Sequence, residues 1–239
     1  MTKKEVLFLI GLIFIISLVS SLVSAADVAY IYKNKIKIDP NFISAFNELG
    51  LSVDQIQDTK VRTTDFSKYR FIFVTDERFR KPNEIPVTQY PSVITNYYFG
   101  EQWGLTDNDG ISKLASNNPL SVNKNNQIIQ VYTTGVDGRG VGIPYYFLDD
   151  ENKAPGFFTV ARTYTGNQND DYNFGDVIAY ANDNSHLING KYTEGKICFY
   201  GIVKTQFWTP QAKQMFLDCV RFVSIKCYDD SECDDNNEH

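Results

Sequence analysis

Residues 28–56 read VAYIYKNKIKIDPNFISAFNELGLSVDQI, and this stretch decides the fold class. The apolar run at 28–32 predicts a first strand, and a second strand is expected at about 51–56. A helical pattern separates the two runs. A strand, a helix and a second strand in this order are typical of α/β proteins with a parallel sheet.

The helix between these strands has recognisable ends. Asp39 is suited to capping it, and Pro40 fits the first helical position, where no backbone N–H is needed. Phe42 and Phe46 fall on one face, and Gly50 is suited to ending the helix. This segment therefore predicts an amphipathic helix that packs on the sheet.

Further strands are expected along the chain. Residues 71–74, FIFV, form a continuous apolar run that suits a strand buried on both faces. A final helix is expected at 209–223, where apolar residues recur on one face. The fold class predicted is α/β, flavodoxin-like and doubly wound, with a mostly parallel sheet and an extra strand-rich middle section. The remaining predicted strands are 92–96, 127–133, 145–148, 157–162, 176–181 and 196–201.

The N-terminal segment 1–25 predicts export. Lys3 and Lys4 precede an uncharged apolar run at 6–23, and small residues follow around Ala25. The segment is either a cleaved signal peptide or a retained single membrane anchor, because its apolar run is also long enough to cross a bilayer. Both outcomes place the following domain outside the membrane. We therefore expect an extracellular or cell-surface protein, associated with the membrane only if the segment is uncleaved.

The chain divides into the N-terminal segment, an α/β domain at 26–226 and an acidic tail at 227–239, which is either disordered or the start of a truncated module. The formal net charge is −6, and the tail alone accounts for it. The body is therefore close to neutral. A neutral body without a basic stripe argues against a nucleic-acid partner. The tail's acidic residues are Asp229, Asp230, Glu232, Asp234, Asp235 and Glu238.

Four cysteines are disulfide candidates. Cys227 and Cys233 enclose a short loop, so a bond between them is expected in an exported chain. Cys198 and Cys219 lie on a predicted strand and the helix after it, and either pair or remain buried thiols. Their spacing does not match a zinc site, and we expect no metal.

Four segments of the chain carry a family resemblance: residues 28–50, 65–74, Asn118-Pro119-Leu120, and 195–202 followed by 209–223. They resemble the class I glutamine amidotransferase-like superfamily, which includes the ThuA-like proteins and other exported members. The resemblance covers roughly residues 27–225 and implies the family's α/β fold.

Active members of this family use a Cys nucleophile with a His and a Glu. The nucleophile turn is expected after 92–95, where this chain places Tyr97 and Tyr98 and lacks a Cys. The His and Glu are expected after Gly201, but residues 202–207 read IVKTQF. The resemblance therefore implies a catalytically degenerate member without the amidotransferase reaction, and we name no catalytic residue.

Other sites are less clearly indicated. Asp76 and Glu77 follow a buried strand at its carboxyl end, where open α/β sheets place their sites, and with Glu101 they offer carboxylates for a hydrolase. His186 lies in a predicted turn. The glycine-rich residues 135–142 lack the ending of a phosphate loop, so we expect no cofactor.

Aromatic residues favour a binding role. Tyr97, Tyr98 and Trp103 cluster near the expected mouth of the family's pocket, together with the carboxylates Asp76, Glu77 and Glu101. Aromatic side chains of this kind occur in interfaces and ligand sites, and also in cores. The sequence favours an exported, non-catalytic binding or scaffolding domain whose ligand is an envelope protein or a glycan. A hydrolase and a structural envelope subunit are the alternatives.

Overall fold

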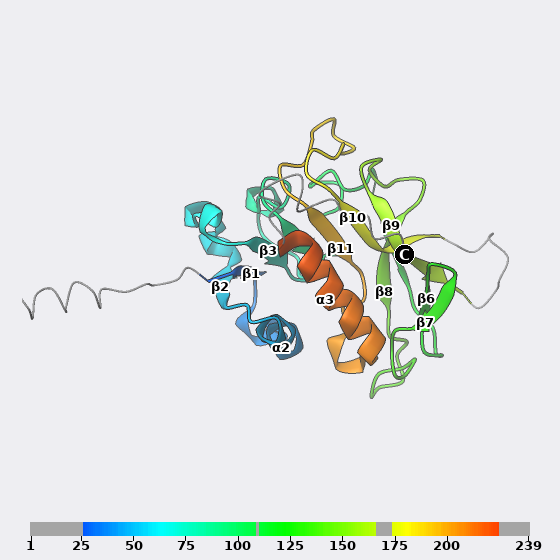
Figure 1. Ribbon diagram of the computed structural model, residues 1–239. Coiled ribbons are helices and arrows are strands. Elements are labelled where there is room, and N and C mark those ends of the chain that lie inside the picture. Colours follow the sequence, from blue (N-terminus) through cyan, green and yellow to red (C-terminus); the bar gives the residue numbers. More distant parts are fainter. Residues whose placement is uncertain (1–25, 109, 166–173, 225–239) are drawn as a thin grey trace, which may run out of the picture.

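The computed structural model describes residues 26–108, 110–165 and 174–224. Within them, eleven strands form one mixed sheet (Figure 1). The strands are β1 Val28–Tyr32, β2 Val53–Gln57, β3 Phe71–Val74, β4 Ser92–Ile94, β5 Ile111–Leu114, β6 Ser121–Lys124, β7 Gln127–Gln130, β8 Tyr145–Asp149, β9 Phe158–Tyr164, β10 Gly175–Ala181 and β11 Ile197–Tyr200. The α-helices are α2 Pro40–Glu48 and α3 Pro210–Ser224.

The sheet has a parallel half and an antiparallel half. The order is β2-β1-β3-β4-β11-β10-β9-β6-β7, and the pairs from β2 to β11 are parallel. From β11 onward the pairs along this path are antiparallel, and β8 pairs antiparallel with both β5 and β10. The prediction of an α/β fold is confirmed, but the sheet is mixed rather than mostly parallel.

The two faces of the parallel half are covered differently. Alternate strand residues such as Tyr30 and Phe73 pack with α2 and α3, and their neighbours Ile31 and Ile72 pack on the other face. Figure 1 shows α3 lying in front of the sheet along β11. In the described chain, the second face is covered by loops and short 3-10 turns, such as those at Asp58–Thr63 and Pro82–Glu84.

The doubly wound arrangement predicted from the sequence would place helices on this second face. Within the described residues, loops and short 3-10 turns cover it instead. The connection after β3 carries Pro82, Pro86 and Pro91. Proline lacks the backbone donor that a helix interior needs, so this connection suits turns better than a long helix.

The predicted helix ends are confirmed at α2. The Asp39 side chain accepts a hydrogen bond from the backbone N–H of Asn41 at 2.9 Å, and Pro40 occupies the first helical position. Phe42 and Phe46 are buried against Phe216 of α3. Their ring centroids lie 4.9 Å and 5.6 Å, respectively, from the ring centroid of Phe216. The aromatic side chains thus join both helices to one face of the sheet.

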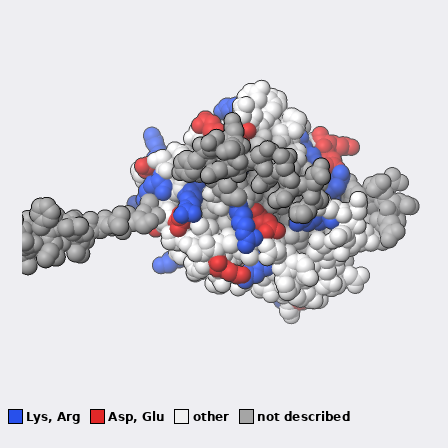
Figure 2. All heavy atoms as spheres, viewed as in Figure 1, with Lys and Arg blue, Asp and Glu red and all other residues white. Residues whose placement is uncertain are grey.

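A disulfide links β11 to α3. Cys198 and Cys219 are bonded and fully buried. Cys227 and Cys233 lie outside the described residues, as do the predicted signal or anchor segment and the acidic tail. None of the helices in the described ranges has the length and apolar character needed to cross a membrane. Figure 2 shows acidic and basic side chains interspersed over the visible face.

Candidate functional site

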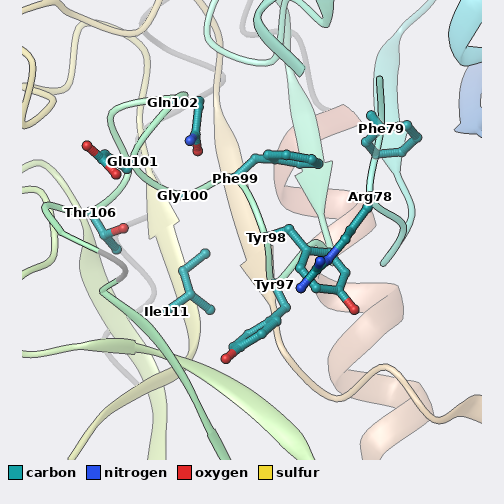
Figure 3. A pocket seen from close by; sticks show the side chains of 10 residues that line it. All are labelled: Arg78, Phe79, Tyr97, Tyr98, Phe99, Gly100, Glu101, Gln102, Thr106 and Ile111. Atoms are coloured by element: carbon teal, nitrogen blue, oxygen red, sulfur yellow. The ribbon is translucent and has the colours of Figure 1, made fainter. Parts of the chain in front are cut away.

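Two hollows lie beside the segments that follow β3 and β4. The larger, of about 500 Å³, is here called the aromatic hollow (Figure 3). The smaller, of about 280 Å³, is called the strand-end crevice. The aromatic hollow is lined by Arg78, Phe79, Tyr97, Tyr98, Phe99, Gly100, Glu101, Gln102, Thr106 and Ile111.

Aromatic rings form one side of the aromatic hollow. The guanidinium of Arg78 lies over the ring of Tyr98, 4.7 Å from its centroid, and Tyr97 packs edge-to-face against Tyr98. Tyr97 and Tyr98 are partly exposed, whereas Arg78 and Glu101 are exposed. Figure 3 shows Glu101 on the opposite side of the hollow from Arg78. The hollow therefore combines ring faces with one cationic and one anionic group.

A buried amide positions the segments that carry these rings. The Asn96 side chain donates to the carbonyls of Thr75 and Glu77, each at 2.8 Å, and its oxygen accepts from the backbone N–H of Tyr98 at 2.8 Å. Asn96 is fully buried. It fastens the segment after β4 to the segment after β3. The sequence did not indicate this role for Asn96, because an Asn after a strand is common in turns.

Trp103 does not belong to the exposed aromatic group. It is 4% exposed, and its indole N–H donates to the carbonyl of Pro82 at 2.9 Å. Its ring packs edge-to-face on Phe99 at 5.7 Å. Trp103 therefore belongs to the core beneath the hollow, while Tyr97, Tyr98 and Glu101 line the hollow itself.

Asp76 lies in the strand-end crevice. Its carboxylate accepts from the Tyr146 hydroxyl at 3.0 Å and from the backbone N–H of Tyr97 at 3.3 Å. Burial raises the pKa of Asp76, and the nearby charge of Lys204 opposes that rise. Lys204 follows β11 and also lines the crevice. The sequence did not indicate that Lys204 and Tyr146 lie beside Asp76, because both come from segments distant in the chain from it.

Glu77 borders the same crevice but is 3% exposed. Its carboxylate accepts from the backbone N–H of Lys33 at 3.0 Å and from the backbone and side-chain amides of Asn34, each at 3.1 Å. These donors are two backbone groups and one side-chain amide of the residues that follow β1. Glu77 therefore holds that segment in place, and its lone pairs are already occupied. Asp76 and Glu77 adjoin one crevice, whereas Glu101 lies at the aromatic hollow.

The position expected for a nucleophile carries other groups. The Thr95 hydroxyl is buried and donates to the carbonyl of Val74 at 2.8 Å. The Tyr97 ring stacks on Tyr146, with centroids 4.7 Å apart. His186 pairs with Tyr192 through an isolated β-bridge among turns, away from both hollows. Each of these side chains is held by a packing or hydrogen-bond contact.

Comparison with known proteins adds little to what the geometry of the site shows. No protein-family model and no curated protein sequence matches the chain. Among solved structures, the chain is similar to a glutamine amidotransferase from Thermotoga maritima. The identity is 11%, the match covers 82% of this chain and 83% of that one, and the TM-score is 0.41. A likeness of this extent carries no inference about activity.

Proposed function

We propose that this protein is an exported, non-catalytic binding domain that holds a saccharide unit of an envelope glycan in the aromatic hollow. The observation that carries the proposal is the geometry of Tyr98, whose ring lies under Arg78 beside a hollow bordered by Glu101. The domain's amidotransferase-like, ThuA-like and catalytically degenerate character is part of the same proposal. It is supported by the four sequence segments that resemble the family.

The chemistry of the lining favours a sugar. A sugar ring offers apolar C–H faces that pack on aromatic rings, and hydroxyls that pair with carboxylate, amide and guanidinium groups. Glu101, Gln102 and Arg78 supply these polar groups around Tyr97 and Tyr98. A volume of about 500 Å³ suits a small ligand, since such sites span about 300–1,000 Å³. A protein partner would need about 800 Å² of matching surface on each side.

Export has two supports. The first is the basic, apolar and small-residue order of residues 1–25. The second is the Cys198–Cys219 disulfide, because such bonds persist in oxidising compartments. A flavodoxin-like origin for the parallel half is supported by its order β2-β1-β3-β4-β11, which matches the 2-1-3-4-5 order of that fold.

The hydrolase alternative has weaker support. A pair of carboxylates in one cleft would need both Asp76 and Glu77 to reach a substrate, but Glu77 is occupied by the backbone and side-chain amides after β1. A purely structural envelope subunit is consistent with the fold, but it would not require the exposed ring and charge arrangement of the aromatic hollow.

The test is binding of the full chain to an immobilised panel of envelope oligosaccharides, followed by titration calorimetry with those retained. Tyr98→Ala and Glu101→Gln should each weaken binding about tenfold or more, which corresponds to about 1.4 kcal/mol. Tyr192→Ala is the matched control, because Tyr192 is 57% exposed and lies outside the hollow. Retention of no saccharide, or equal binding by wild type and Tyr98→Ala, would contradict the proposal.

A further inference from the structure

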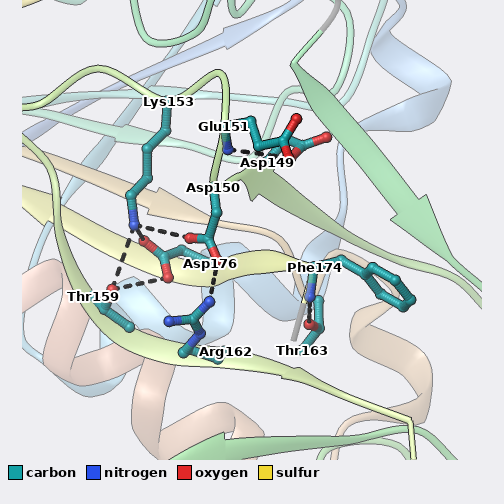
Figure 4. A network of polar contacts seen from close by, with 9 residues as sticks. All are labelled: Asp149, Asp150, Glu151, Lys153, Thr159, Arg162, Thr163, Phe174 and Asp176. Atoms are coloured by element: carbon teal, nitrogen blue, oxygen red, sulfur yellow. Dashed lines mark hydrogen bonds and ion pairs between the residues drawn. The ribbon is translucent and has the colours of Figure 1, made fainter. Parts of the chain in front are cut away.

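A polar cluster in the antiparallel half joins a lysine to a fully buried carboxylate (Figure 4). The ammonium of Lys153, in the turn after β8, forms an ion pair with the carboxylate of Asp176 in β10. The Asp176 side chain is completely buried, and the Lys153 side chain is 17% exposed. Figure 4 shows the two side chains pointing toward each other, with Asp150 and Thr159 beside them.

We propose that Lys153 and Asp176 become joined by an intramolecular isopeptide bond. The Lys153 nitrogen attacks the side-chain carboxyl carbon of Asp176, an amide C–N bond forms, and one C–O bond of the carboxyl breaks. The ammonium and the carboxylate together lose one water molecule and both charges. The atoms and charges balance without any oxidant, reductant or activating group.

The neighbouring groups suit this reaction. The Oδ1 of Asp150 lies 3.3 Å from the Lys153 nitrogen, where it can take a proton from the ammonium and deliver it to the departing oxygen. Arg162 contacts the other oxygen of Asp150 and holds that carboxylate in place. The Thr159 hydroxyl donates to Oδ1 of Asp176 at 2.9 Å, where charge develops as the carboxyl carbon becomes tetrahedral.

Confinement favours bond formation over its reversal. The folded chain holds nitrogen and carboxyl in contact, so the reaction is intramolecular and has a high effective concentration. Burial of Asp176 keeps bulk water away from the amide once it has formed. The Lys213–Glu48 ion pair lacks this setting, since its side chains are 40% and 50% exposed. The proposed bond would tie the turn before β9 to the start of β10, and it does not depend on the binding function.

The test is peptide mass spectrometry of the full chain after reduction, denaturation and cleavage at glutamates. Because Glu151 and Glu194 bracket a segment without other glutamates, one peptide, 152–194, carries both residues. The bond predicts that this peptide is lighter than its sequence mass by one water. A succinimide at Asp176 would give the same mass loss. Further cleavage at Arg162 distinguishes them, because only the isopeptide bond keeps the two halves joined.

Variants complete the experiment. Lys153→Arg keeps the positive charge but should show the unmodified mass, whereas the matched control Lys213→Arg should retain the loss of water. Asp150→Asn should slow bond formation in a time course after expression, and an unchanged rate would overturn the role given to Asp150. A wild-type peptide 152–194 at its full sequence mass, or halves that separate after cleavage at Arg162, would overturn the bond itself.

Discussion

The hydroxyl of Tyr146 donates a hydrogen bond to the carboxylate of Asp76 at 3.0 Å, although 70 residues separate them in the chain. Tyr146 belongs to β8 in the antiparallel half, and Asp76 follows β3 in the parallel half. The same tyrosine ring stacks on Tyr97 at the aromatic hollow. This contact therefore connects the two halves of the sheet and the two hollows.

The first prediction concerns Asp76 and pH. Burial raises its pKa in the folded state, so the folded protein binds this proton more tightly than the unfolded chain does. The stabilisation that comes from this tighter proton binding is therefore fully present below the usual aspartate pKa of about 3.9. It is lost as the pH rises through the higher pKa of Asp76 in the folded state. Asp76→Asn, which resembles the protonated form, should match wild type in acid and exceed it in unfolding free energy at neutral pH.

Urea denaturation across a pH series would measure this difference. Asn182→Ala serves as the control, since Asn182 is exposed and its side chain does not titrate, and its difference from wild type should stay nearly constant over the same range. A difference for Asp76→Asn that is independent of pH would show that the Asp76 carboxyl is not destabilised by burial in the fold.

The second prediction concerns the disulfide between β11 and α3. Cys198 and Cys219 are 21 residues apart, and closing a loop of this size stabilises a protein by about 3 kcal/mol. Adding a reductant should therefore lower the unfolding free energy of the wild type by about that amount. The Cys198→Ala/Cys219→Ala double variant should be less stable at the outset and insensitive to the reductant. An equal response of both proteins would contradict this account.

The sequence predicted the local elements better than their arrangement. β1, α2 and α3 were placed nearly to the residue, because Asp39 with Pro40 and the apolar faces of the helices are local signals. β5 and β6 were missed. Each has four residues of mixed polarity, and their strand identity depends on pairing with β8 and β9. Strand direction in the second half is likewise decided by partners distant in the chain.

The candidate site was predicted by residue type but not by role. Tyr97, Tyr98 and Trp103 are equivalent as aromatic residues in one short stretch. Their roles differ only in the folded protein, where the Trp103 indole donates a hydrogen bond to the carbonyl of Pro82 and the ring is buried. Glu77 likewise differs from its neighbour Asp76 because the backbone that follows β1 supplies donors to it. Local sequence contains neither partner, so it could not distinguish these roles.

The third prediction separates those aromatic roles. Trp103→Ala should lower the unfolding free energy by about 3–5 kcal/mol, because it removes a buried ring and leaves a cavity. Tyr98→Ala should cost about 1 kcal/mol, because the ring is partly exposed and loses surface contacts with Arg78 and Tyr97. Chemical denaturation of both variants gives the comparison. Similar losses would show that the two rings are not divided between core and hollow.

The fourth prediction concerns Asn96, the buried amide between the segments after β3 and β4. Asn96→Ala removes one of the two hydrogen bonds to each of the Thr75 and Glu77 carbonyls, and it removes the partner of the Tyr98 N–H. The loss of three buried hydrogen bonds should cost about 3 kcal/mol in unfolding free energy, measured by denaturation. Asn118→Ala is the control, since Asn118 is exposed, and it should change stability by less than about 0.5 kcal/mol. The Asn96 variant should also weaken ligand binding at Tyr98, because the segment carrying that ring loses its attachment to the segment after β3. A stable Asn96→Ala protein with unchanged binding would mean that packing alone positions the hollow.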